Sequence, residues 1–164
     1  DPDHLMVGAQ YEEAVYAPLY YGYGTQTARS AFARSIDKLI MDRAPDTILV
    51  LLTASPEVIR QRMKENPRPQ WAARVEYQEQ GPSSKTTQMH PRGILLEKDV
   101  EFVLNRFEEE YGASLIRKSF VLDTSIKTVE ETLGEFAANA QPLLSDRDRI
   151  RILTFRALGS IGQA

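Results

Sequence analysis

Two arginines on a short helix that follows a buried strand are the residues of this chain best suited to bind an anion. Residues 47–52 (TILVLL) form a continuous β-branched and leucine run, typical of a parallel strand covered on both faces. Ser55 and Pro56 predict that a helix begins directly after it. Ligands of open α/β sheets bind beyond the carboxyl ends of the strands, so Arg60 and Arg62 on this helix indicate catalytic contacts to a phosphate. The alternative, that both are solvated helix residues, stays open.

A basic stretch rich in proline, glycine and serine follows this helix. Between Arg60 and Arg92 seven basic residues outnumber three acidic ones, in a chain whose formal net charge is −3. Residues 66–93 show no sustained periodicity, which predicts a long, lid-like basic loop. Such a loop can exclude water and bring cations to a transferring phosphate. The alternative is a disordered surface loop whose positive charge has no function. The candidate phosphate-binding residues of the lid are Arg68, Arg74, Lys85 and Arg92.

Composition restricts the class of protein. The 164 residues, 42% hydrophobic and 26% charged, predict a single globular domain over 1–164. The chain has no cysteine, and its two histidines, His4 and His90, lie far apart, so we expect no metal site made of side chains alone. No apolar run approaches the roughly 20 residues that span a bilayer, and no signal peptide opens the chain, which predicts a cytoplasmic protein with no membrane partner. The net negative charge argues against general nucleic-acid binding.

The remaining segments alternate between helix and strand. Apolar periodicity predicts helices over 27–42 and 97–111, and residues 120–124 (FVLDT) form a second buried run. A capping box at Thr128 and Glu131 begins a further helix, and Ser145 caps a final basic one. This order predicts an α/β fold, a three-layer parallel sheet with helices on both faces and right-handed crossovers.

Four pieces of this sequence, in their order and spacing, carry a family resemblance. They are residues 53–63 (TASPEVIRQRM), the lid-like loop, the pattern Val-x-Phe-Val-x-x-x-Phe-x-x-x-Tyr over 100–111, and FVLDTS over 120–125. Together they resemble the second half of the thymidylate kinase and deoxynucleoside kinase group of P-loop phosphotransferases, and the resemblance spans residues 7–140. It implies a parallel five-stranded sheet, ATP and Mg²⁺ as cofactors, and transfer of the terminal phosphate of ATP to a nucleoside or nucleoside monophosphate.

The phosphate-binding loop of that family has no counterpart in this sequence. No Gly-x-x-x-x-Gly-Lys-Ser/Thr motif occurs, and that loop cradles the triphosphate and helps to hold magnesium. In the family it follows the first strand, at the centre of the sheet. Three explanations stay open: the strand and loop precede Asp1 in the gene, another chain supplies them, or the protein is a degenerate relative that no longer binds nucleotide. We favour the first.

Residues 5–22 (LMVGAQYEEAVYAPLYYG) occupy the place where the family carries its third strand and an acidic base or magnesium partner. The family's usual Asp-Arg or Glu-Arg pair is absent as such, and Glu12 and Glu13 are the acidic candidates that could orient an acceptor hydroxyl. Tyrosine rings can stack on a base, and arginines of the next helix can contact an acceptor phosphate. The alternative is that the glutamates are simply exposed, that the tyrosines pack in the core, and that the arginines lie at the surface. The candidate substrate-binding residues are Tyr16, Tyr20, Tyr21, Arg29 and Arg34.

Two functions from different classes follow from this reading. The first is a nucleoside or nucleotide kinase, of which the chain is the acceptor and lid portion, and its partner is a small-molecule nucleoside or nucleotide. The second is a non-catalytic module of kinase fold that binds or assembles through its tyrosine-rich segment and its basic C-terminal helix. A homodimer stays open under both, and the sequence does not identify the acceptor.

Overall fold

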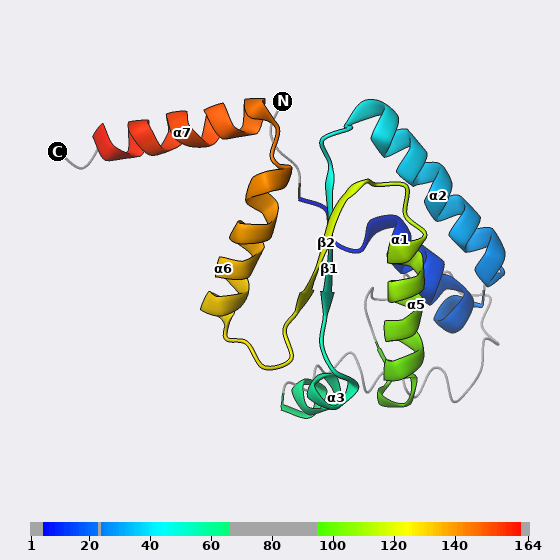
Figure 1. Cartoon of the computed structure of the whole chain (residues 1–164). Helices are drawn as coiled ribbons and strands as arrows, with labels where there is room; N and C mark the ends of the chain where they lie inside the picture. Colours follow the sequence, from blue (N-terminus) through cyan, green and yellow to red (C-terminus); the bar gives the residue numbers. More distant parts are fainter. Residues whose placement is uncertain (1–4, 23, 66–94, 162–164) are drawn as a thin grey trace.

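A computed structural model describes residues 5–22, 24–65 and 95–161 (Figure 1). Its sheet consists of β1 (Ile48–Thr53) and β2 (Lys118–Asp123). The other elements, in chain order, are α1 (Ala9–Tyr16), the π-helical turn η1 (Ala17–Tyr21), α2 (Gln26–Arg43), α3 (Pro56–Glu65), the 3₁₀ turn η2 (Glu97–Asp99), α5 (Val100–Gly112), α6 (Val129–Ala140), the 3₁₀ turn η3 (Gln141–Leu143) and α7 (Asp146–Ile161). None of the described helices is long and apolar enough to cross a membrane.

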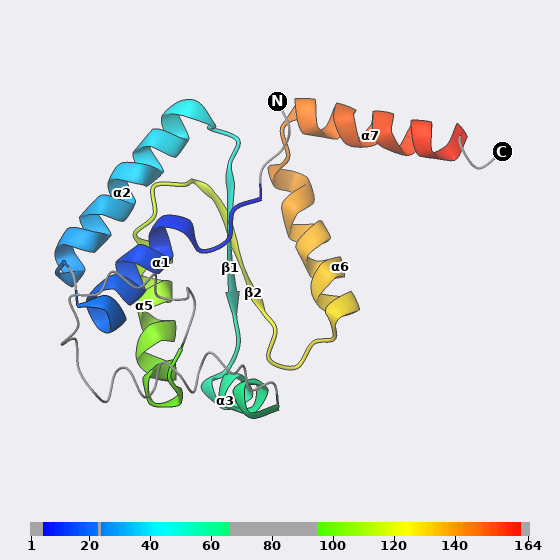
Figure 2. The ribbon, with the colours of Figure 1, turned by 180° about the vertical axis from the view of Figure 1, so that it is seen from behind.

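The two strands are parallel, as their continuous apolar character predicts. Ile48 lies opposite Lys118 and the register continues to Thr53 opposite Asp123. Helices α1, α2 and α5 lie on one side of the strand pair and α6 on the other (Figures 1 and 2). The mixed α/β class is therefore confirmed. The described residues form only two strands, so the five-stranded sheet implied by the resemblance is not seen within them.

Local capping signals begin three of the helices at the predicted places. The Ser55 hydroxyl accepts a hydrogen bond from the Val58 amide (3.4 Å), ahead of α3. Thr128 and Glu131 form the predicted capping box of α6. The Ser145 hydroxyl accepts from the Asp148 amide (3.2 Å) at the start of α7. Each cap satisfies an amide that the first turn of a helix leaves without a partner.

Within residues 5–22, where the resemblance placed a strand, residues 9–21 are helical. Gly8, with a φ of +75°, directly precedes α1, and its carbonyl accepts the amides of Tyr11 and Glu12. The buried residues of this helix, among them Ala14 and Val15, pack between α2 and α5. The tertiary contacts of this apolar face explain why the segment is helical, since such contacts supply most helical stability in proteins.

A buried ionic cluster holds α1, α2 and α5 together. Asp37 of α2 is fully buried and accepts hydrogen bonds from Gln10 (2.9 Å), Tyr11 (2.8 Å), the Ser114 hydroxyl (3.0 Å) and the Leu115 amide (3.1 Å). Arg34 lies 3.1 Å from Asp37 and 3.3 Å from Glu110, which in turn accepts from Arg106 (2.6 Å). Two carboxylates and two guanidinium groups therefore balance one another in the interior.

We expect Asp37→Ala to destabilise the fold strongly. The substitution leaves several buried donors and the Arg34 charge without their acceptor, and breaking a buried ion pair in this way costs about 3–5 kcal/mol. Chemical denaturation of both proteins measures the difference. Asp46→Ala is the matched control, because Asp46 is exposed and pairs with Lys118 at the surface. Equal losses for the two variants would contradict a structural role for the cluster.

The same carboxylate makes stability fall in acid. Burial alone would raise the pKa of Asp37, but its four hydrogen bonds outweigh burial and hold the pKa below 3.8, its ordinary value. The stabilisation from this group is therefore complete above about pH 5 and is lost as the pH falls through the folded pKa. Thermal melting between about pH 5 and pH 3 should show a shallower pH dependence for Asp37→Asn than for the wild type. Parallel curves would show that other carboxylates control acid unfolding.

Candidate functional site

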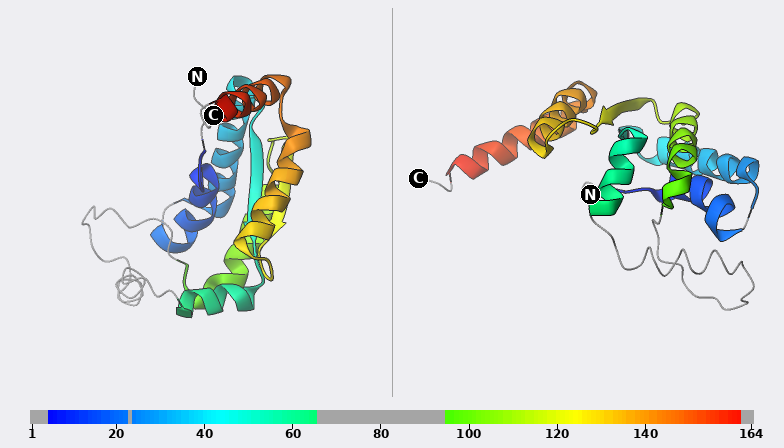
Figure 3. Two further views of the ribbon diagram at one scale, coloured as in Figure 1. Left: turned by 90° about the vertical axis from the view of Figure 1, so that its left-hand side faces the viewer. Right: turned by 90° about the horizontal axis from the view of Figure 1, so that it is seen from below.

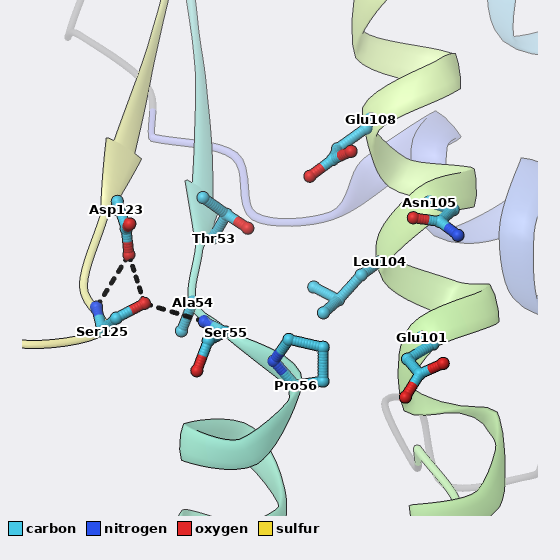
Figure 4. Close-up of a pocket in the computed structure, with 10 residues that line it drawn as sticks. All are labelled: Thr53, Ala54, Ser55, Pro56, Glu101, Leu104, Asn105, Glu108, Asp123 and Ser125. Atoms are coloured by element: carbon cyan, nitrogen blue, oxygen red, sulfur yellow. Dashed lines mark hydrogen bonds between the residues drawn. The ribbon is translucent and has the colours of Figure 1, made fainter.

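A pocket opens at the carboxyl ends of β1 and β2, between the start of α3 and one face of α5 (Figure 4). Its volume of about 460 Å³ is within the range typical of small-molecule sites. Three segments that are distant in the sequence meet there because parallel strands end at the same edge of a sheet. The lining residues are Thr53, Ala54, Ser55, Pro56, Glu101, Leu104, Asn105, Glu108, Asp123 and Ser125.

A short hydrogen-bond relay fixes one wall of this pocket. The Asp123 carboxylate accepts hydrogen bonds from the Ser125 amide (2.8 Å) and hydroxyl (2.5 Å), and the Ser125 hydroxyl accepts from the Ser55 amide (2.8 Å), as Figure 4 shows. The relay therefore ties the end of β2 to the start of α3. Hydrogen bonds from Ser125 lower the pKa of Asp123, so this carboxylate is ionised at neutral pH.

The lining of the pocket is acidic and rich in hydrogen-bond acceptors. Glu101 and Glu108 project from α5 and Asp123 ends β2, whereas none of the described residues that line the pocket is basic. These carboxylates do not converge on a point: within the described ranges, no three histidine, aspartate or glutamate side chains are close enough to hold a metal ion. The arrangement suits a ligand that presents N–H or O–H donors, such as a sugar or a base, rather than a bare phosphate.

Arg62 lies at the same strand ends, beside the pocket. Its Nη1 donates to the Thr124 hydroxyl (3.0 Å) and its Nη2 to the Thr124 carbonyl (2.5 Å). The Thr124 amide in turn donates to the Thr53 carbonyl (2.8 Å), which continues the strand pairing by one residue. The guanidinium therefore reaches the carboxyl edge of the sheet, where its position after the strand led us to expect it. A contact to phosphate stays a prediction.

Arg60 points elsewhere. Its Nη2 donates to Glu101 of α5 (2.8 Å) and its Nη1 lies 4.0 Å from Glu57. The hydrogen bond to Glu101 raises the pKa of Arg60. The two arginines of α3 therefore diverge: Arg62 contacts the strand ends, and Arg60 joins α3 to α5 at the rim of the pocket.

The candidate residues of α1 and α2 are not among the described residues that line the pocket, and most of them lie in contacts between helices. Glu13 of α1 forms an ion pair with Arg29 of α2 (3.8 Å), and the Glu12 side chain lies against Gly8. Arg34 belongs to the buried ionic cluster and also donates to the Glu110 carbonyl (3.0 Å). In this structure Glu13, Arg29 and Arg34 therefore connect helices of the fold, and Glu12 lies against the residue that precedes its own helix.

The tyrosine candidates pack against one another and α5. The Tyr16 ring stacks on the Tyr20 ring (centroids 5.7 Å apart) and meets Phe107 edge to face (5.6 Å). The Tyr20 hydroxyl donates to Asp99 (3.1 Å) and accepts from the Leu96 amide (3.1 Å), and burial raises its pKa. Tyr21 belongs to η1, and its side chain is outside the described part of the chain.

The lid candidates also lie outside the described residues, so their positions are not compared with the pocket. They are Arg68, Arg74, Lys85 and Arg92. Conversely, the sequence reading missed every polar residue that lines the pocket. Two signals were available: Asp123 and Ser125 end a predicted parallel strand, and Glu101, Asn105 and Glu108 recur at i, i+4 and i+7 of a predicted helix.

Comparisons with known proteins do not assign a family. No family model matches the chain, and no curated protein or solved structure shows significant similarity to it. The geometry of the strand ends and the residues around them therefore carries the functional interpretation.

We expect Ser125→Ala to destabilise the strand ends by about 1–2 kcal/mol, because it removes two hydrogen bonds and leaves the half-buried Ser55 amide without its acceptor. Urea denaturation measures this loss. Ser119→Ala, at an exposed serine of β2, is the matched control and should change stability by less than about 0.5 kcal/mol. If both variants behave alike, the relay does not hold the pocket wall.

Proposed function

We propose that this chain is the acceptor and lid portion of a P-loop phosphotransferase that moves the terminal phosphate of ATP to a nucleoside or nucleoside monophosphate in the cytoplasm. One observation carries the proposal: the ends of two parallel strands, the Arg62 guanidinium and a pocket of small-molecule size meet at one edge of the sheet. Ligands of open α/β sheets bind at this edge.

The open edge of β1 supports the proposal. Among the described residues only β2 pairs with β1. Leu52 is 64% exposed, although its register partner Leu122 is 1% exposed. The left view of Figure 3 shows residues 5–8 on the side of β1 away from β2, and Leu5 and Val7 there are almost fully exposed. An edge strand presents unpaired N–H and C=O groups, so a further strand at this edge would complete the sheet.

That further strand is where the proposal places the phosphate loop. The described residues do not fit a triphosphate, because the pocket lining holds three carboxylates and no lysine or arginine. ATP and Mg²⁺ would therefore be held mainly by a loop outside residues 1–164, with arginines of the lid and Arg62 adding positive charge. When bound, ATP supplies the phosphoryl group.

The acidic pocket is assigned to the acceptor. Glu101, Glu108 and Asp123 can accept hydrogen bonds from sugar hydroxyls or base amines, and so orient an acceptor beside the strand ends. Glu12 and Glu13 remain candidates for the base, and Tyr16 and Tyr20 for stacking, in a complete protein. In this structure these residues lie in contacts among the helices, outside the pocket that the proposal assigns to the acceptor.

A non-catalytic binding or assembly module is the second candidate function. The observation that favours it is the acidic pocket, whose described lining contains no group that could neutralise a transferring phosphate. The codons immediately upstream of Asp1 separate the two candidates. A strand followed by a phosphate loop supports the kinase, and the extended protein should then phosphorylate nucleosides or nucleoside monophosphates with Mg-ATP. An initiating methionine codon directly upstream, or an inactive extended protein, would overturn it.

The 164-residue chain by itself should neither transfer phosphate nor bind Mg-ATP tightly. A triphosphate needs a nest of backbone amides, a lysine and a hydroxyl for magnesium, and the sequence offers no motif with that combination. Isothermal titration with Mg-ATP is the measurement. Micromolar affinity accompanied by nucleoside phosphorylation would show that these residues contain a different phosphate site.

In an extended protein with activity, Arg62→Ala should lower kcat by about 100-fold or more, since loss of one electrostatic contact to a transition state costs about 2.7–4 kcal/mol. Stability should change by less than about 1 kcal/mol, because the side chain is exposed. Arg43→Ala, an exposed arginine at the end of α2, is the control for kinetics and stability. An unchanged kcat would show that the contact of Arg62 with Thr124 is purely structural.

A further inference from the structure

The arginines of α2 that could bind a phosphate on the acceptor are paired with carboxylates of the fold. From their place in the sequence, Arg29 and Arg34 are candidates for such a contact. In the structure Arg29 forms an ion pair with Glu13 (3.8 Å), and Arg34 lies 3.3 Å from the carboxylate of the buried Glu110. Both guanidinium groups are therefore balanced by negative charge within the helices.

The two arginines of α3 add little positive charge for an acceptor phosphate. Arg60 donates a hydrogen bond to Glu101 at the rim of the pocket (2.8 Å), so its charge is balanced there. Arg62 contacts Thr124, and the proposed function assigns it to the transferring phosphate. An acceptor that already carried a phosphate would need further cations, yet the described residues that line the pocket include no lysine or arginine.

The pocket instead presents negative charge to a molecule that enters it. Glu108 is exposed and points from α5 toward the strand ends (Figure 4), and no basic side chain within the described ranges forms an ion pair with it. Asp123 lies across the pocket, where it accepts hydrogen bonds from Ser125. A phosphate monoester carries nearly two negative charges at neutral pH. Its entry would set like charges against one another at close range.

We propose that this pocket selects an uncharged nucleoside over the corresponding nucleoside monophosphate, and that Glu108 determines the selection. The inference rests on the proposed function, because it takes the pocket as the acceptor site and chooses between the two acceptor classes named there. A sugar hydroxyl or a base amine can donate a hydrogen bond to a carboxylate, whereas an ionised phosphate oxygen only accepts. Selectivity of this kind comes from repelling the wrong ligand as well as from binding the right one.

Binding to the 164-residue protein tests the selection without requiring catalysis. The probes are the four common deoxynucleosides and their 5′-monophosphates, titrated at neutral pH and low salt while the NMR signals of the backbone amides and of the Asn105 side-chain amide are followed. We expect at least one nucleoside to bind about ten-fold or more tightly than its monophosphate. Salt screens the repulsion, so the preference should become smaller at about 0.5 M NaCl.

Variants at one position test the role of Glu108. Glu108→Gln keeps the size of the side chain and removes its charge, so it should reduce the preference at least about three-fold, chiefly through tighter binding of the monophosphate. Glu130→Gln is the matched control, because Glu130 is an exposed glutamate of α6 that does not line the pocket, and this variant should keep the full preference. Far-ultraviolet circular dichroism checks that both variants remain folded.

Three binding results would overturn the inference. They are monophosphates that bind the wild type as tightly as nucleosides, no binding of either class up to about 10 mM, and a preference that Glu108→Gln leaves as large as Glu130→Gln does.

Phosphoryl transfer by the extended protein tests the proposed function separately. If the extended protein transfers no phosphate while the 164-residue chain still selects nucleosides, the kinase proposal fails and the selectivity of the pocket stands. If it phosphorylates monophosphates in preference to nucleosides, the phosphotransferase proposal stands and the inference is wrong.

Discussion

The parallel pairing of β1 with β2 is the constraint on which the candidate site depends. A chain that leaves one strand and enters a parallel neighbour must cross back over the sheet, and here it does so through α3 and α5. Both strands therefore end at the same edge. This places Ser55, which begins α3, against Ser125, which follows β2, and leaves the Arg62 side chain within reach of Thr124. An antiparallel pair would have put these groups at opposite ends of the sheet.

The ionic cluster around Asp37 constrains the positions of the helices, as the strand pairing constrains the strand ends. Apolar packing alone between α1, α2 and α5 would allow the helices to slide, because many registers bury similar area. A carboxylate that accepts hydrogen bonds from Gln10, Tyr11 and the Leu115 amide is satisfied in one arrangement only. Buried polar groups of this kind can contribute specificity more than net stability. Since α5 carries one wall of the pocket, a defined position of α5 is also a condition for the pocket.

The strands and the starts of the helices depend on residues close together in the sequence, and these features were predictable. Continuous apolar runs identified both strands, and the side chains of Ser55, Thr128 and Ser145 marked the starts of three helices. Long-range contacts were not predictable in the same way. Arg34 was a candidate for phosphate binding because its sequence neighbours do not indicate that Glu110, 76 residues further along the chain, pairs with it. The helical state of residues 9–21 likewise depends on packing against α2 and α5, which are distant in the sequence.

If the proposed phosphotransfer is right, the distribution of charge around the strand ends separates two tasks of the enzyme. Cations belong where negative charge moves, and acceptors belong where a neutral sugar or base is oriented. Here the acceptors line the pocket, whereas Arg62 lies outside it against Thr124 and Arg60 is neutralised by Glu101. Closing this arrangement around a phosphate requires positive charge from outside the pocket, at the uncovered edge of β1 or from the basic segment that follows α3. Under the proposed function, the open edge and the acidic pocket are therefore two consequences of one physical condition: the described residues would form the half of a site that recognises the acceptor, and the half that neutralises phosphate would approach from beyond them.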